Sequence, residues 1–174
     1  MIDVLVMHTP SVATTPNLQT IIRAGIDQTN AAMARTGLQV SLRLVGTGQS
    51  SPFTSLGNVA TDVLALQFEG ESAAPFVGGP FLDDVLTMRE STGADLVVLL
   101  YQPPSGGPCG NTNPPKTVDG MSSALAFAVL APGCAVLPDV GFAHEVTHNL
   151  TAFHNYCCAP EPDSELWAHG YRDL

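Results

Sequence analysis

The chain has 174 residues, of which 45% are hydrophobic and 13% are charged. This length fits one domain, and the apolar share is too high for a disordered chain. Six basic residues face sixteen acidic ones, and no cluster of Lys or Arg could neutralise phosphates, which excludes nucleic acid and anionic membranes as expected partners. The longest apolar runs, 96–101 and 124–138, are too short or too interrupted to span a membrane. We therefore expect a soluble monomer.

The first part of the chain alternates predicted strands and helices. Residues 2–8 are aliphatic and partly β-branched, which is typical of a short buried strand. Asn17 can cap a helix that runs to about Arg35 and stops at Gly37. Residues 38–45 alternate apolar and polar side chains, which is the period of a half-buried strand. The opening is therefore strand, helix, strand.

Further elements are expected in the second part of the chain. They are helices at 59–68 and 81–91, a central strand at 95–101, a long loop at 102–120, an edge strand at 122–129 and a last helix near Phe142. The central strand is predicted from its continuous apolar run, and the edge strand from small residues that alternate with larger apolar ones. This order of elements predicts an α/β fold with a mixed sheet.

The cysteine content indicates the cellular compartment in which the chain folds. Four cysteines, together with 16 Gly and 14 Pro, suggest an extracellular or periplasmic chain. Four cysteines allow three pairings, and the spacing alone does not choose among them. Cys157 and Cys158 are adjacent, and neighbours of this kind rarely bridge each other because the geometry is strained.

One segment contains the candidate metal-binding residues, since three of the five histidines fall within residues 144–154. His144 and His148 are four residues apart, so on a helix both project from one face and can ligate one ion. Glu145 is rotated around the helix axis and can reach a water beside the ion without ligating it. If the helix ends soon after His148, the chain can turn and bring in His154. Three neutral imidazoles and a water make an open tetrahedral zinc site, which is the catalytic kind.

The alternative interpretation is that these are ordinary polar residues of a helix and a loop. The position of Glu145 and the third histidine argue against it. His8, at the end of the first strand, is expected to be structural.

This pattern resembles the H-E-x-x-H-x-x-G-x-x-H motif of the metzincin zinc endopeptidases, and within them the reprolysin-like group of secreted bacterial enzymes. The resemblance extends to residues 2–10, 26–30, 44–46, 88–97 and 167–172. It implies a metzincin-type α/β fold, with a mixed twisted sheet of about five strands, an antiparallel edge strand and helices that include the zinc-binding one. It also implies secretion and a disulfide between Cys109 and Cys134.

The resemblance also implies a mechanism. His144, His148 and His154 would bind Zn²⁺, and Glu145 would take a proton from the attacking water as general base. A peptide or protein substrate would lie along the edge strand and pair with its backbone. The residues expected to bind it are Ala124, Leu125, Ala126 and Phe127. One catalytic domain would cover 1–174, with an N-terminal subdomain at 1–150 and a short or truncated C-terminal subdomain at 151–174.

The chain departs from the family pattern at several positions. Thr147 and Thr151 replace glycines, Asn155 stands where many members have Asp, and no methionine follows His154, so the Met-turn is missing. A β-branched residue at position 151 is costly if the turn needs a positive φ. These departures support two alternatives, namely a catalytically degenerate zinc- or protein-binding module and a zinc hydrolase of non-peptide amides or esters. The intact Glu145 favours an enzyme.

The few basic residues limit substrate recognition. Any preference for acidic side chains would have to come from Arg89, Lys116 or Arg172.

Overall fold

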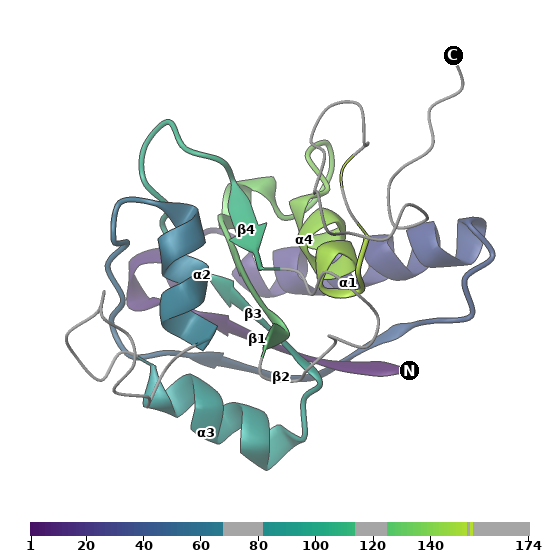
Figure 1. The fold of residues 1–174 in the computed structure, drawn as a ribbon, viewed down its shortest axis with the longest axis horizontal. Coiled ribbons are helices and arrows are strands. Elements are labelled where there is room, and N and C mark those ends of the chain that lie inside the picture. Colours follow the sequence, from purple (N-terminus) through teal and green to yellow (C-terminus); the bar gives the residue numbers. More distant parts are fainter. Residues whose placement is uncertain (68–81, 114–124, 153, 155–174) are drawn as a thin grey trace.

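The computed structural model describes residues 1–67, 82–113, 125–152 and 154. Its strands are β1 (Ile2–His8), β2 (Leu42–Gln49), β3 (Leu96–Leu100), β4 (Gly110–Thr112) and β5 (Phe127–Leu130), and its α-helices are α1 (Leu18–Arg35), α2 (Val59–Gln67), α3 (Asp83–Thr92) and α4 (Gly141–Asn149). The strands form one sheet in the order β2-β1-β3-β5-β4 (Figure 1). All pairs are parallel except β4 with β5. The predicted mixed α/β sheet with an antiparallel edge strand is confirmed.

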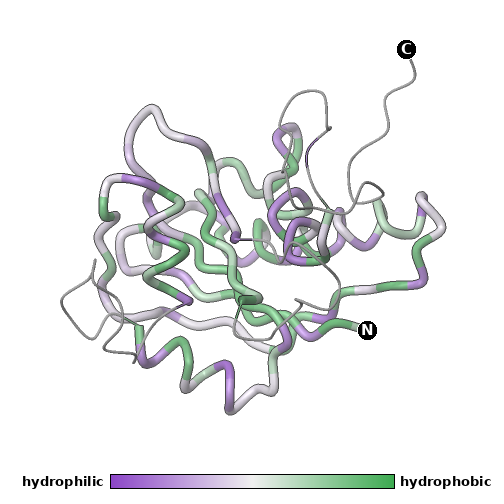
Figure 2. The backbone as a smooth tube through the Cα atoms, in the orientation of Figure 1, coloured by the Kyte–Doolittle hydropathy of each residue, from purple (hydrophilic) through white to green (hydrophobic). Residues whose placement is uncertain are grey.

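Helices cover both faces of the sheet. Alternate side chains of β1 point to opposite faces, so Val4 and Val6 pack with α1 and α4, whereas Leu5 and Met7 pack with α2 and α3. All five residues of β3 are buried, as expected for a central parallel strand. Figure 2 shows the apolar strands at the centre of the molecule. None of the helices in the described ranges is long and apolar enough to cross a membrane.

The N-terminal elements agree with the sequence prediction apart from two details. β1 and α1 have the predicted bounds, and Gly37 ends α1 with a φ of 78°. Asn17 does not cap α1 with its side chain, because its backbone is left-handed and only its carbonyl accepts the first bonds. β2 begins at Leu42 and continues to Gln49, further along than predicted.

Two glycines explain the shift of β2. A Cβ at Gly46 would lie 3.1 Å from Leu5, and one at Gly48 would lie 3.2 Å from Met7. Both positions therefore favour glycine because β2 lies close against the side chains of β1. The predicted strand ended at residue 45, before both glycines.

The predicted edge strand at 122–129 is wrong. β5 begins at Phe127, lies inside the sheet and pairs with β3 on one side and with β4 on the other. The antiparallel edge strand is β4, which falls within the predicted loop at 102–120. Three residues are too few for an alternating pattern, so β4 carried no signal in the sequence. A Cβ at Gly110 would lie 2.6 Å from the carbonyl oxygen of Val129, which explains why a glycine starts β4.

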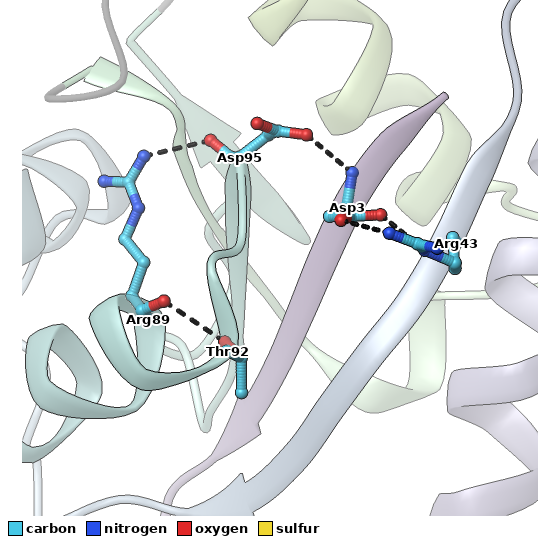
Figure 3. Close-up of polar contacts among 5 residues, drawn as sticks. All are labelled: Asp3, Arg43, Arg89, Thr92 and Asp95. Atoms are coloured by element: carbon cyan, nitrogen blue, oxygen red, sulfur yellow. Dashed lines mark hydrogen bonds and ion pairs between the residues drawn. The ribbon is translucent and has the colours of Figure 1, made fainter.

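Polar contacts join the N-terminal ends of β1, β2 and β3 (Figure 3). Asp3 on β1 accepts two hydrogen bonds from Arg43 on β2, and the Asp3 amide donates to the carboxylate of Asp95. The guanidinium of Arg43 holds the pKa of Asp3 below its usual range. Arg89 of α3 donates to the carbonyl oxygens of Ala94 and Asp95. These contacts fix α3 to the start of β3.

A disulfide joins Cys109 to Cys134, as the family resemblance implied. Cys109 directly precedes β4, and Cys134 ends a 3₁₀ helix at Pro132–Cys134 that leads toward α4. The bridge thus ties the edge strand to the segment before α4. Cys157 and Cys158 lie outside the described residues, as does most of the predicted C-terminal subdomain, so the proposed division at residue 150 stays a prediction.

Candidate metal centre

Close packing places α4 against α1 and the sheet. A Cβ at Gly141 would lie 2.7 Å from the carbonyl oxygen of Cys134, and one at Gly25 of α1 would lie 2.8 Å from the ring of Phe142. Gly141 lets its backbone approach that of Cys134, and Gly25 leaves room for the ring of Phe142, so α4 has little freedom to shift. On this helix, Phe142 and Val146 face the core, whereas His144 is exposed.

The structure brings the three predicted histidines together. His144 Nε2 lies 3.0 Å from His148 Nε2 and 3.1 Å from His154 Nε2. The ligand atoms of all three lie within 4.8 Å of one another. Nitrogens bound tetrahedrally to one zinc at 2.0–2.1 Å would be about 3.3 Å apart, so the spacing fits a single ion. Partial desolvation of the His144 ring, and then the nearby His148 and His154, lower the pKa of His144, which favours the neutral, ligating form.

A backbone contact selects the tautomer of His148. Its Nδ1 lies 2.5 Å from the carbonyl oxygen of Ala152. A carbonyl can only accept, so Nδ1 carries the proton and donates it, and Nε2 presents its lone pair toward the other two histidines. This arrangement, in which the second ring nitrogen is held by an acceptor, is usual for metal-binding histidines.

A tight turn after α4 brings in His154. The amide of Thr151 donates to the carbonyl oxygen of His148, and the amide of Ala152 donates to the carbonyl oxygen of Thr147. Thr151 has a φ of 69° and is buried. The turn therefore needs the left-handed conformation that the family's glycine adopts easily and that threonine adopts at a cost.

Glu145 lies on the buried side of α4. Its Cγ is 3.3 Å from the position a Cβ would take at Gly110, so its side chain runs past the backbone of β4. Burial raises the pKa of Glu145 to about 7. Its Oε2 is buried and has no hydrogen-bond partner among the described residues. Buried carboxylate oxygens without partners are rare and point to a functional role.

These features agree with the comparisons to known proteins. The sequence model of the M12B reprolysin-like metallopeptidase family matches residues 2–168. The chain belongs to this family. Membership of a metallopeptidase family implies a catalytic metal, and the His144, His148 and His154 triad could hold it.

Relatives of this reprolysin-like chain carry a more specific name. A protein named peptidyl-Asp metalloendopeptidase from Stenotrophomonas maltophilia is 27% identical over 156 residues, which are 90% of this chain and 34% of that protein. One with the same name from Xanthomonas campestris pv. campestris is 25% identical over 173 residues, or 98% of this chain and 38% of that protein. The chain thus spans between a third and two fifths of the length of these relatives.

A solved structure supports the fold of the reprolysin-like chain. Described as the structure of a chaperone-substrate complex, it aligns with a TM-score of 0.65 and 19% identity, over 88% of this chain and 26% of that chain. At this identity the similarity concerns the fold alone.

Of the residues predicted to bind substrate, Leu125, Ala126 and Phe127 do not form an edge of the described sheet. The carbonyl oxygen of Leu125 accepts from Gln67, that of Ala126 from the amide of Val97, and that of Phe127 from Thr112 Oγ1. Their carbonyl oxygens are therefore used within the fold, and substrate binding by these residues stays a prediction. Ala124 lies outside the described residues.

Other predicted residues lie apart from the triad or outside the described ranges. His8 ends β1, and its Nδ1 lies 3.4 Å from the carbonyl oxygen of Thr9. Asn155 lies outside the described residues. The residues predicted from the sequence pattern did not include Gly110 and Asn149, which both lie against Glu145. The four-residue spacing from Glu145 was an available signal for Asn149.

The strained turn gives a first prediction. We expect Thr151→Gly to raise the free energy of unfolding by about 1 kcal/mol, because glycine adopts a positive φ without the steric cost that threonine bears. Thr147→Gly is the matched control, since Thr147 lies within α4 and glycine should destabilise it by up to about 1 kcal/mol. Urea denaturation of both variants measures the difference. A Thr151→Gly variant less stable than the wild type would contradict the strain argument.

Proposed function

We propose that this chain is the catalytic domain of a zinc endopeptidase, in which His144, His148 and His154 bind one zinc ion and Glu145 is the general base. The observation that carries the proposal is the convergence of three imidazole Nε2 atoms beside a buried carboxylate with an unpartnered oxygen. A purely structural site would gain nothing from such a carboxylate next to its first ligand.

The donor set supports zinc in particular. Three imidazoles from a helix and the following turn, with a fourth position left for water or substrate, are typical of catalytic zinc sites. When bound, zinc supplies Lewis acidity, which lowers the pKa of a water toward about 7 and polarises the scissile carbonyl.

Glu145 would move the protons of the reaction. As a carboxylate it would accept a proton from the water that attacks the scissile carbonyl carbon, and it would then donate that proton to the nitrogen of the leaving amine. The C–N bond breaks, and the products are a carboxylate and a free amine. The packing of Glu145 against β4 restricts its side chain and would keep its oxygens oriented.

The substrate is proposed to lie along β4 rather than β5. β4 is the terminal strand of the described sheet, and its first residue, Gly110, lies beside Glu145. A peptide in extended conformation could add to this edge through backbone hydrogen bonds, which would hold a scissile bond near the general base.

The disulfide supports an extracytoplasmic location. Bridges such as Cys109–Cys134 form and persist in oxidising compartments and are rare in the cytosol. We propose on this ground that the chain is secreted.

The name of the relatives suggests cleavage beside aspartyl residues, which we propose for this chain as well. Arg89 is not available to recognise a carboxylate, because it is buried, bonded to the backbone and stacked 4.8 Å from the ring centre of Phe127. Lys116 and Arg172, both outside the described residues, are the remaining candidates. We expect Lys116→Gln or Arg172→Gln to lower kcat/KM for an Asp-containing peptide by about 10-fold or more, since a charge-assisted bond contributes about 1.5–3 kcal/mol.

The Asn analogue of the same peptide is the control for this prediction. Its turnover should change little in the variant that loses the recognition residue. Equal losses for both peptides, or no loss in either variant, would contradict recognition by these two side chains.

Digestion of a reduced, denatured protein tests the proposed activity. We expect mass spectrometry to show fragments from internal cleavage, no fragments after chelation of the metal, and recovery on addition of zinc. A chain that binds one zinc but cleaves no protein would instead support the degenerate module, and cleavage restricted to small esters would support the non-peptide hydrolase.

A further inference from the structure

Asn149 is a buried polar residue that lies one helical turn after Glu145 and that the proposed reaction does not use. It is 4% exposed. Its Nδ2 donates to the carbonyl oxygen of Glu145 at 3.3 Å and to that of Phe127 at 3.4 Å. Its Oδ1 is buried and has no partner among the described residues. The reverse assignment of the amide would place an oxygen against two carbonyls, so the orientation is fixed by its donors.

The Phe127 carbonyl connects this amide to the edge strand. It also accepts a hydrogen bond of 2.7 Å from Thr112 Oγ1 on β4. One carbonyl of β5 therefore links the end of α4 with β4, the strand that runs past Glu145. These hydrogen bonds connect the turn of α4 that carries Glu145 with the proposed substrate strand.

The two unpartnered atoms near this link are both acceptors. Glu145 Oε2 and Asn149 Oδ1 belong to side chains at positions i and i+4, whose Cβ atoms on a helix are about 5–6 Å apart. Leaving two such oxygens buried without donors is unfavourable, because each loses its hydrogen bonds to water. A single buried water has two hydrogens to donate, so one water between the two oxygens would satisfy both.

We propose that Asn149 is a positioning residue for Glu145, which it holds through its amide bonds and through one buried water that donates to both Asn149 Oδ1 and Glu145 Oε2. The expected effect on kcat rests on the proposed endopeptidase function, whereas the expected presence of the water does not.

Two variants separate this role from packing. Asn149→Leu keeps the volume but offers no polar atom, whereas Asn149→Ala leaves room for additional water. With positioning through water, we expect kcat to fall by about 100-fold in Asn149→Leu and less in Asn149→Ala, with KM and bound zinc nearly unchanged. A packing role predicts the opposite order, because leucine would preserve the packing better than alanine, and that order would overturn the proposal.

Asn30 provides the matched control. Asn30 lies on α1 and is not part of the triad, and its side chain bonds both the carbonyl oxygen and the amide of Leu42, at 3.0 and 2.7 Å. Asn30→Leu therefore removes a comparable amide clamp and should lower stability without lowering the kcat of the folded, zinc-loaded fraction. An equal fall in kcat in this variant would contradict a specific role of Asn149.

A high-resolution crystal structure of the metal-free wild type tests the water independently of activity. We expect an ordered water within hydrogen-bond distance of both oxygens, and its loss in Asn149→Leu. No water at this place in the wild type would overturn the proposal even if the protein cleaves peptides. A wild type with the water but without cleavage would instead refute the proposed function alone.

Discussion

Replacing Glu145 with Gln should lower kcat for peptide cleavage by about 10²–10⁴-fold while leaving one zinc per chain. Glutamine keeps the size of the side chain and so its packing against Gly110, but it cannot accept a proton from water at neutral pH. Glu145 is not a predicted metal ligand, so metal binding should persist. Steady-state kinetics on a peptide substrate, with zinc content measured on the same sample, give both quantities.

Glu90→Gln is the control for this variant. Glu90 is an exposed residue of α3, and the same change there removes one negative charge without touching the site. Its kcat should equal that of the wild type. If Glu145→Gln retained most of the activity, the general-base assignment would be wrong, and if it lost zinc together with activity, the two roles would not be separated.

Replacing His148 with Ala should weaken zinc binding by more than about 100-fold. Loss even of a residue that only supports a metal ligand typically costs 10–100-fold in affinity, and here one of three direct ligands is removed. The change also removes the hydrogen bond to the Ala152 carbonyl, which helps to fix the turn that carries His154. Competition with a chromophoric chelator measures the affinity.

His8→Ala controls for the loss of an imidazole elsewhere. His8 ends β1 and is not part of the triad, so zinc affinity should be unchanged. A zinc affinity in His148→Ala within a few-fold of the wild type would show that the metal lies elsewhere.

Local patterns predicted much of the fold. The apolar run at 2–8 gave the correct bounds of β1, and the start and stop signals at Asn17 and Gly37 gave those of α1. The patterns failed where long-range packing decides. Gly46 and Gly48 belong to β2 because of side chains on β1, and β4 exists only because Gly110 to Thr112 pair with β5. Neither fact is encoded in the neighbouring residues.

In the candidate site, too, local features were predictable from the sequence and those set by long-range packing were not. The spacing of His144, His148 and His154 was sufficient to predict that they meet, because the helix and the turn that join them are local. The positive φ at Thr151 followed from the family's glycine at that position. The burial of Glu145 against Gly110 and its link through Asn149 to Phe127 depend on how α4 packs on the sheet, which only the folded structure reveals.

Titration of zinc into metal-free protein, with peptide cleavage followed at each addition, tests the central claim most directly. We predict that activity rises in proportion to bound zinc and levels off at one equivalent, and that Glu145→Gln binds the same equivalent without gaining activity. Cleavage that does not depend on zinc, or that survives in Glu145→Gln, would contradict the account.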